Sequence, residues 1–270
     1  MSLKNIESLL HTLINHQHIR ITIRGNVAIT AALSIFPKNS TIFISEEGGW
    51  IHYEKAPLKL GLIAVKVSCY DAVIDMNDLQ NKLTKLKPKA LLYQNPGGYF
   101  AQQPMREIHD LCKKNDCLVI LDVSGSIGTS LCNGKYADIL VGSFGHEKLV
   151  NAQVGGFISA HDKELFKKIT AFADSLQNEE SLAKIYLELQ KLPRRIEQLI
   201  TLRSNIIQDL AGFNIVHPKD TGFVVVIKYS SLEEKNKLIS YCQGHKLEYT
   251  ECPRYIRLNQ PAISIEVKRR

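Results

Sequence analysis

The hydrophobic positions in the first 160 residues alternate between helical spacing and short continuous runs. Residues 3–17 carry leucine and isoleucine at intervals of three or four, which predicts an amphipathic helix. A second helical pattern follows Gly25 and stops at Pro37, because proline cannot continue a helix. Helices are also predicted near 76–86 and 104–115. The short apolar runs predict strands at 41–45, 62–67, 90–94, 118–122, 139–143 and 155–160.

Strand, helix and strand follow one another repeatedly in this part of the chain. This order is typical of α/β folds, because neighbouring parallel strands need a crossover connection and the crossover helices lie on the faces of the sheet. We therefore predict that residues 1–162 form a large cofactor-binding domain of the α/β class, with a mostly parallel sheet sandwiched by helices.

The pattern changes after about residue 162. A long helical stretch covers residues 179–210 and contains Pro193, which predicts an interruption or a kink at that point. We expect residues 163–270 to form a small C-terminal α+β domain. Besides the long helix, the predicted elements of this domain are a helix near 231–243 and strands at 223–229, 247–251, 255–258 and 262–267.

The composition is that of a globular protein with a sizeable core. The chain has 270 residues, of which 44% are hydrophobic. No run of about 18 apolar residues occurs and the N-terminal residues do not resemble a signal peptide, so we expect a soluble, cytoplasmic protein with no membrane partner. The six cysteines form no CxxC pair, which favours buried thiols over disulfides or a metal site.

The net charge of +7 and the pI ≈ 9.0 suit an anionic ligand or partner. The lysines are nevertheless scattered, as at Lys82, Lys85, Lys87 and Lys89, and no basic motif is interleaved with aromatic residues. This pattern favours a solvated basic face over a nucleic-acid site. We expect no nucleic-acid partner, with a tRNA substrate left open.

An aspartate and a lysine stand where two neighbouring strands are predicted to end. Asp122 closes the run 118–122, and Lys148 follows shortly after the run 139–143. Ligands of open parallel sheets bind at the carboxyl ends of the strands, so these two side chains can hold opposite ends of one flat cofactor. Pyridoxal phosphate matches the pair, because its aldehyde binds a lysine amine and its ring nitrogen needs a carboxylate to stay protonated.

The phosphate of such a cofactor needs hydroxyls and backbone N–H groups. Ser143 supplies a hydroxyl, and Gly25 and Asn26 open a helix whose free N–H groups and positive dipole end favour a phosphate. Each residue alone has an ordinary explanation, since Asp122 can cap a turn and Lys148 can be a surface lysine. Their order and spacing together point to the cofactor.

From about residue 24 to 160, this order resembles the fold-type I pyridoxal-phosphate enzymes, the aspartate aminotransferase superfamily. The segment Arg24-Gly25-Asn26-Val27-Ala28-Ile29 is similar to the turn that binds the phosphate in that family. The segment Asn95-Pro96-Gly97-Gly98 resembles the family's Asn-Pro-Thr-Gly turn. The resemblance implies that Asn95 meets the hydroxyl of the cofactor ring.

Two further segments carry the resemblance. Leu121-Asp122-Val123-Ser124 is similar to an Asp-x-Ala/Ser motif, which implies that Asp122 binds the ring nitrogen and that Ser124 packs under the ring. Ser143-Phe144-Gly145-His146-Glu147-Lys148, followed by Gly155-Gly156, resembles the segment that carries the cofactor lysine. The resemblance implies an internal aldimine on Lys148, with Ser143 and His146 beside the cofactor.

An aromatic residue commonly stacks on the cofactor ring in this family. Trp50, the only tryptophan of the chain, stands in the matching loop. His52 and Tyr53 are alternatives for this place, and a tryptophan of the core is the competing explanation for Trp50.

The segment Tyr255-Ile256-Arg257-Leu258-Asn259 resembles the strand that carries the substrate-binding arginine of the family. A planar guanidinium suits the two oxygens of a carboxylate. We therefore expect Arg257 to bind a substrate carboxylate, with Arg254 as the competing candidate.

The resemblance implies a homodimeric enzyme that acts on an amino acid or another amine, in the first place an aminotransferase. Gly125 departs from the pattern, because sugar aminotransferases usually carry a glutamine there, and the chain is short for the family. Three alternatives stay open. They are a lyase, a sulfur or selenium transferase, which His146 and the basic charge would suit, and a protein that binds the cofactor without catalysis.

Overall fold

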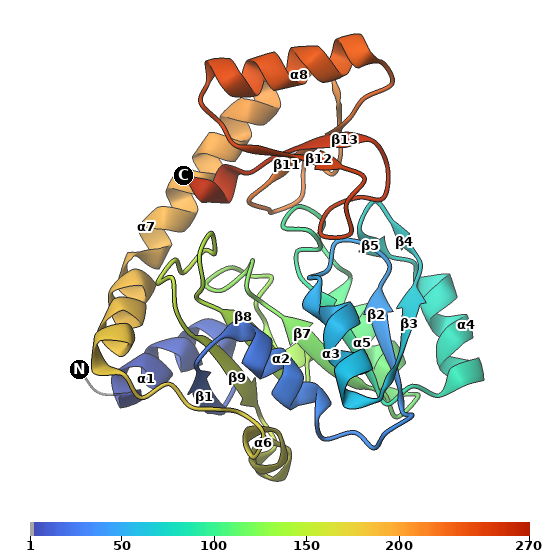
Figure 1. Cartoon of the computed structure of the whole chain (residues 1–270), viewed down its shortest axis with the longest axis vertical. Helices are drawn as coiled ribbons and strands as arrows, with labels where there is room; N and C mark the ends of the chain where they lie inside the picture. Colours follow the sequence, from blue (N-terminus) through green and yellow to red (C-terminus); the bar gives the residue numbers. More distant parts are fainter. Residues whose placement is uncertain (1–2) are drawn as a thin grey trace.

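A large and a small β-sheet, joined by a long helix, make up the computed structural model, which describes residues 3–270 (Figure 1). Within these residues the large sheet has seven strands in the order β1-β9-β8-β7-β6-β2-β3. The strands are β1 (His18–Thr22), β2 (Thr41–Ser45), β3 (Ile63–Val67), β6 (Ala90–Gln94), β7 (Leu118–Asp122), β8 (Ile139–Ser143) and β9 (Gly156–Ala160). Every strand except β1 lies close to a run that the sequence predicts to be a strand, and β1 is not among those predictions.

Five neighbouring strands of the large sheet, from β3 to β8, run parallel to one another. Only β9 runs antiparallel to its two neighbours, β8 and β1. The predicted mostly parallel sheet is therefore confirmed. Strands β6 and β9 are buried along their whole length, because helices cover both faces of the sheet.

The helices form two layers, one on each face of the large sheet (Figure 1). On one face, α1, α4 and α5 bury side chains such as Leu10 and Ile108 in one core cluster. On the other face, α2, α3 and α6 contribute Ala32 and Ile169 to a second cluster. The predicted α/β sandwich is confirmed. The helices are α1 (Leu3–Ile14), α2 (Gly25–Leu33), α3 (His52–Leu60), α4 (Met76–Leu86), α5 (Met105–Lys113) and α6 (Lys163–Thr170).

Local side-chain chemistry fixes where several helices begin and end. The carboxylate of Asp75 accepts hydrogen bonds from two backbone N–H groups at the start of α4, and Asp162 does the same for one N–H of α6. At the end of α3, Gly61 takes a left-handed conformation with φ 71°, which glycine adopts without strain.

The small sheet is antiparallel, with the strand order β10-β11-β13-β12. Helix α7 (Glu179–Asp209) leads to it and continues through Pro193, so the predicted interruption does not occur. No helix within residues 3–270 is long and apolar enough to cross a membrane. The remaining elements are β4 (Cys69–Tyr70), β5 (Val73–Ile74), η1 (Gly134–Tyr136), β10 (Asn214–Ile215), β11 (Val225–Lys228), α8 (Leu232–Gly244), β12 (Tyr249–Cys252), β13 (Ala262–Ile265) and η2 (Val267–Arg269).

The predicted domain boundary at residue 162 falls just before α6. Helix α6 contacts β9 and β1 of the large sheet, and α7 begins beside α1 (Figure 1). The long helix therefore connects the two sheets by running from one to the other. The division of the chain into 1–162 and 163–270 stays a prediction.

The predicted strand at 255–258 is wrong. This segment is a turn between β12 and β13, closed by hydrogen bonds from the Arg257 N–H to the Arg254 carbonyl and from the Arg254 N–H to the Leu258 carbonyl. The Tyr255 carbonyl instead accepts a hydrogen bond of 2.8 Å from the Gly48 N–H, in a loop that follows β2. The turn thus joins the small sheet to the large one.

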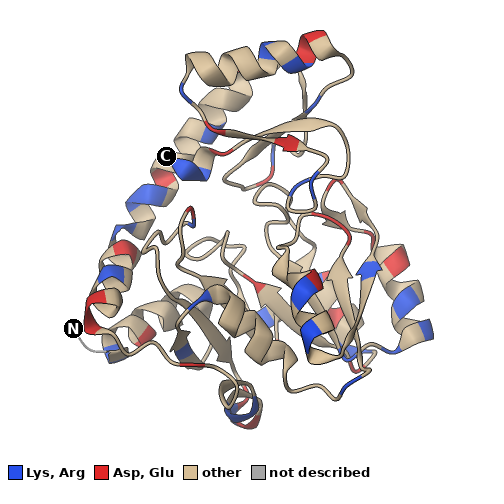
Figure 2. Cartoon of the chain, in the orientation of Figure 1, with Lys and Arg blue, Asp and Glu red and all other residues tan. Residues whose placement is uncertain are grey.

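Charged residues lie mainly on the outer helices α3, α4, α6, α7 and α8 (Figure 2). Many basic residues there stand one turn from an acidic partner, as in the pairs Lys184 with Glu180 and Lys237 with Glu233. Much of the positive charge is therefore spread over solvated helix faces and balanced locally.

A buried histidine ties three elements of the large sheet region together. The Nε2 of His16 lies 3.1 Å from the Gly134 carbonyl and 3.2 Å from the Ala137 carbonyl, and Nδ1 lies 3.0 Å from the Ser159 hydroxyl. The neutral ring satisfies all three contacts when Nε2 carries the hydrogen. Burial, with a contribution from nearby His161, lowers the pKa of His16 to about 4.

We predict that His16 makes folding sensitive to acid. Between pH 6.5 and 4 the unfolded chain binds a proton at this ring that the folded chain does not, so the free energy of unfolding should fall as the pH is lowered through this window, by up to about 3 kcal/mol. Urea unfolding at a series of pH values measures this loss. The variant His16→Gln should show a flatter pH dependence, and an unchanged slope would contradict the assignment.

Candidate active site

A cavity of about 530 Å³ lies beside the carboxyl ends of β7 and β8, where the loops of the large sheet meet the turn and η2 of the small sheet. Gln94, Asp122 and Ser143, the last residues of β6, β7 and β8, all line it. The structure brings nearly all the predicted site residues to this cavity. They are Gly25, Asn26, Trp50, Asp122, Ser124, Ser143, His146, Lys148 and Arg257.

One end of the cavity is formed by the beginning of α2. In the described chain no side chain caps this helix terminus, and Arg24, Gly25 and Asn26 line the cavity there. Helix α2 can begin so close to β8 only because residue 25 is glycine, since a Cβ there would lie 2.6 Å from the Ser143 Cβ. A helix N-terminus next to the Ser143 hydroxyl is a suitable site for a phosphate group.

Asp122 is held by two hydrogen bonds and is 4% exposed. Its Oδ1 accepts from the Ser124 N–H at 2.8 Å, and its Oδ2 accepts from the Tyr53 hydroxyl at 2.7 Å. Burial, with Asp122 adding to it, raises the pKa of Tyr53 well above its ordinary value, so this phenol stays a hydrogen-bond donor. The carboxylate is therefore fixed in position at the end of β7.

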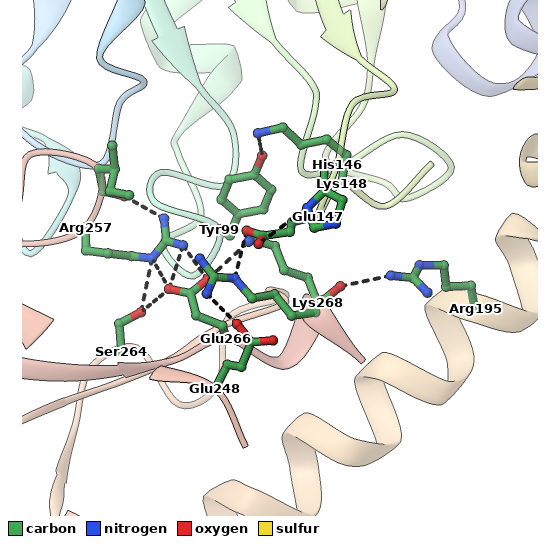
Figure 3. Close-up of polar contacts among 12 residues, drawn as sticks. Tyr99, His146, Glu147, Lys148, Arg195, Glu248, Arg257, Ser264, Glu266 and Lys268 are labelled. Carbon is green, nitrogen blue, oxygen red and sulfur yellow. Dashed lines mark hydrogen bonds and ion pairs between the residues drawn. The ribbon is translucent and has the colours of Figure 1, made fainter. Parts of the chain in front are cut away.

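The Nζ of Lys148 donates a hydrogen bond of 2.8 Å to the Tyr99 hydroxyl (Figure 3). It also lies 4.9 Å from the centroid of the Trp50 ring. Burial alone would lower the pKa of Lys148, but Tyr99 and Asp122 outweigh it and raise the pKa above its ordinary value. Lys148 is therefore protonated at neutral pH in this structure.

Trp50 is the one of the three predicted aromatic candidates that lines the cavity. Its Nε1 donates a hydrogen bond of 2.9 Å to the Asn26 side chain, which orients the indole at the cavity wall. His52 pairs with Thr30 instead, and Tyr53 supports Asp122. The position favours Trp50 for the stacking role.

The structure does not bring Asn95 to the cavity. This side chain is fully buried, donates to the Leu131 carbonyl at 3.1 Å and accepts from the Gln103 N–H at 3.0 Å. The preceding residue, Gln94, lines the cavity, and its buried Nε2 has no hydrogen-bond partner in residues 3–270. Adjacent side chains of an extended chain point to opposite sides, so the side chain that lines the cavity is that of Gln94 and not that of the predicted Asn95.

Arg257 is buried beside the cavity in a cluster with Glu266 and Ser264 (Figure 3). Its Nη2 donates to both oxygens of Glu266 at 2.8 and 2.6 Å, and its Nε donates to the Ser264 hydroxyl at 3.0 Å. The side of the guanidinium that would bind a carboxylate with two hydrogen bonds is therefore occupied within the chain.

Lys268 is a cavity residue that the sequence interpretation missed. It belongs to η2, and its Nζ lies 3.1 Å from Glu266 and 5.0 Å from the centroid of the Tyr99 ring. Burial lowers the pKa of Lys268 to about 8, even though Glu266 favours the charged form. Burial opposes ionisation of Glu266 too, yet Arg257 and Lys268 outweigh it and lower the pKa of that carboxyl to about 2.

Two ion pairs and one backbone contact hold η2 at the cavity (Figure 3). Arg269 contacts Glu147, directly before Lys148 in the chain, at 2.8 Å, and Glu248 at 2.7 Å. The guanidinium of Arg195, on α7, donates to the Lys268 carbonyl at 2.9 Å. The small sheet is thus linked to the loop that carries Lys148.

The predicted residue His146 lies at the rim of the cavity. Its side chain is 72% exposed, and its Nδ1 is 3.5 Å from Glu147. An exposed ring of this kind does not cover the interior of the site.

The family model that matches this chain is that of the DegT/DnrJ/EryC1/StrS aminotransferase family, over residues 2–186. Among the solved structures, NtdA from Bacillus subtilis with bound cofactor PMP is 18% identical, with a TM-score of 0.79 over 99% of this chain and 74% of that one. Alanine–glyoxylate aminotransferase from Nostoc sp. is 12% identical, with a TM-score of 0.75 over 98% and 80% of the two chains. The synthase of 3-amino-5-hydroxybenzoic acid is 16% identical, with a TM-score of 0.77 over 98% and 85%.

We predict that Gly25→Ala lowers the free energy of unfolding by about 1–3 kcal/mol, because the added methyl group would overlap the backbone and side chain of Ser143. Gly212→Ala is the matched control, since, apart from its chain neighbours, no atom of residues 3–270 lies within 4 Å of a Cβ at that position. Urea unfolding of both variants makes the comparison. Equal stabilities would mean that α2 and β8 are not packed as closely as described.

Proposed function

Because this chain belongs to the DegT/DnrJ/EryC1/StrS aminotransferase family, we propose that it is a pyridoxal-phosphate-dependent aminotransferase whose Lys148 holds the cofactor covalently. One observation carries the assignment of residues: Lys148 and Asp122 face the same cavity as the N-terminus of α2. A lysine, a carboxylate and a helix terminus are the three groups that this cofactor requires.

The residues of the cavity fit the cofactor in chemistry. Gly25 leaves the beginning of α2 bare, and Ser143 adds a hydroxyl for the phosphate. The buried Nε2 of Gln94 is a donor without a partner in the described chain, and it can satisfy an oxygen of the ring. Trp50 supplies an aromatic face beside Lys148.

When bound, pyridoxal phosphate supplies an aldehyde that links to amines and a ring that withdraws electrons from the substrate Cα. The chain's own residues supply proton transfer and positioning. The Nζ of Lys148 is the group that moves the Cα proton, and the Tyr99 hydroxyl orients it through their 2.8 Å hydrogen bond. Nζ can accept the Cα proton only as a neutral amine. It must therefore first lose its own proton, which Tyr99 and Asp122 stabilise here.

Asp122 has a different task, which depends on its charge. A carboxylate beside the ring nitrogen favours the protonated form of that nitrogen. The hydrogen bonds from Tyr53 and the Ser124 N–H hold the carboxylate in place and leave lone pairs of both oxygens for a further donor. Ser124 itself is fixed, because its hydroxyl accepts from the Ser143 N–H at 3.0 Å.

The proposed substrate is a small molecule with an amino group, and the enzyme is proposed to be a cytoplasmic homodimer. The family favours amino-group transfer over elimination, sulfur or selenium transfer, and cofactor binding without catalysis. The exposed His146 gives no support to the selenium-transferase alternative. A panel of amino acids tests the choice, since a transaminase forms pyridoxamine phosphate and the keto acid of the donor, a lyase releases ammonia, and a binding protein does neither.

We predict that the purified protein carries pyridoxal phosphate on Lys148. Borohydride reduction followed by peptide mapping should place the pyridoxyl group on this residue, because its amine lies in the cavity near enough to Asp122 for that carboxylate to raise its pKa. The variant Lys148→Arg keeps the positive charge and should lose the label. A pyridoxyl group on a different lysine, or none, would refute the proposal.

We also predict that Asp122→Asn slows turnover on the order of a hundredfold or more, because the ring nitrogen loses the charge that keeps it protonated. Cofactor binding should survive, since Lys148 and the beginning of α2 are unchanged. Asp116→Asn is the control, as it removes the same charge from an exposed position. Stopped-flow absorbance with an amino donor measures the rate, and full activity of Asp122→Asn would make this residue structural only.

A further inference from the structure

A buried cluster beside the cavity holds one more positive than negative charge. Arg257, Lys268 and Glu266 are 3%, 4% and 2% exposed, and both cations contact the same carboxylate. A buried charge without a counter-ion is unfavourable, because it has lost its water and gained no partner. The half-buried Arg269 also lies 3.9 Å from Glu266, but it has two acidic partners of its own, Glu147 and Glu248. Within the three buried residues one positive charge is therefore left over, and an anion in the cavity can complete them.

The two cations differ in what they can still bind. The guanidinium of Arg257 donates to Glu266, to Ser264 and, through Nη1, to the Ile256 carbonyl, so one N–H of Nη1 is left. The ammonium of Lys268 has three N–H donors, and Glu266 is its one carboxylate partner within residues 3–270. Lys268 is thus the cation that has unused N–H donors for a ligand.

Lys268 also stands at a useful position relative to Lys148. Both line the cavity, and their Nζ atoms lie 5.0 and 5.3 Å from the centroid of one ring, that of Tyr99. Lys268 projects toward this ring from η2, whereas Lys148 comes from the loop after β8 (Figure 3). The two amines are therefore close to one ring in the wall of the same cavity, where one ligand can have an amino group at Lys148 and a second group at Lys268.

We propose that Lys268 is a specificity-determining residue that binds the carboxylate of the amino substrate, with the remaining N–H of Arg257 beside it. The proposal rests on the function proposed above and makes an amino acid the substrate class. A carboxylate suits the site because the cluster has a single surplus charge, whereas a phosphate group would bring a larger one. Arg257, which is paired with Glu266, then mainly positions that acid and through it Lys268.

The test uses a carboxylate that cannot react. Propionate has no amine, propionamide has the same shape without the charge, and methylphosphonate carries the larger anion. Trp50 is the only tryptophan and lines the cavity, so its fluorescence reports binding to the cofactor-loaded protein without any turnover. We expect propionate to bind the parent protein more tightly than the other two compounds.

Three variants separate the charge of Lys268 from other effects. Lys268→Met should weaken propionate binding on the order of tenfold or more, as expected for loss of a charge-assisted hydrogen bond. Lys268→Arg keeps the charge and should retain most of the affinity. Lys237→Met, on the outer face of α8, removes an exposed charge and should bind like the parent. Substitution at 268 leaves the backbone bonds of this residue to Phe223 and Arg195 in place.

Several results would overturn the proposal. Equal affinity of parent and Lys268→Met for propionate would exclude Lys268, and equal binding of propionamide would exclude a charged site. Tighter binding of methylphosphonate would assign the cluster to a phosphate group instead. The cofactor absorbance of the same samples is read separately. Loss of cofactor from the parent would count against the proposed function, whereas retained cofactor without selectivity for propionate would count against Lys268 alone.

Discussion

The parallel pairing of β6, β7 and β8 is the constraint on which the site depends. In this register Gln94 lies opposite Asp122, and Asp122 opposite Val141, so the three strands end side by side. Parallel strands bring their carboxyl ends to one edge, where the following loops must turn. The aspartate and the loop of Lys148 are neighbours for this reason, although 25 residues of chain separate them.

The second half of the site is organised by one acid. Glu266 forms ion pairs with Arg257 and Lys268 and so holds both cations at the cavity. Arg269 in turn forms an ion pair with Glu147 of the Lys148 loop. Removing Glu266 would be strongly destabilising, because both buried cations would be left uncompensated. The positive end of the cavity is therefore a property of the folded small sheet and of its contact with the Lys148 loop.

The sequence predicted the parallel sheet, and most of the site residues that it predicted line the cavity, because apolar periodicity and the order of strand-ending polar residues are local signals. It did not predict Tyr99 or Lys268, whose roles come from contacts between residues far apart in the chain. The apolar residues at 255–258 imitate a strand, but they serve to join the two sheets. At Gly125 a Cβ would lie 2.8 Å from the Tyr99 ring, so Tyr99 occupies space that a side chain at 125 would need.

The contact between Gly48 and Tyr255 has a consequence for how such a protein can diversify. This hydrogen bond runs from one backbone to another, so it does not depend on side-chain identity, unlike the bond from the Tyr255 hydroxyl to the Ser45 carbonyl. Ile256 and Arg257 follow directly and face the cavity. Substitution of Ile256 can therefore alter which molecules are accepted while this backbone bond stays in place, provided that no residue is inserted or deleted.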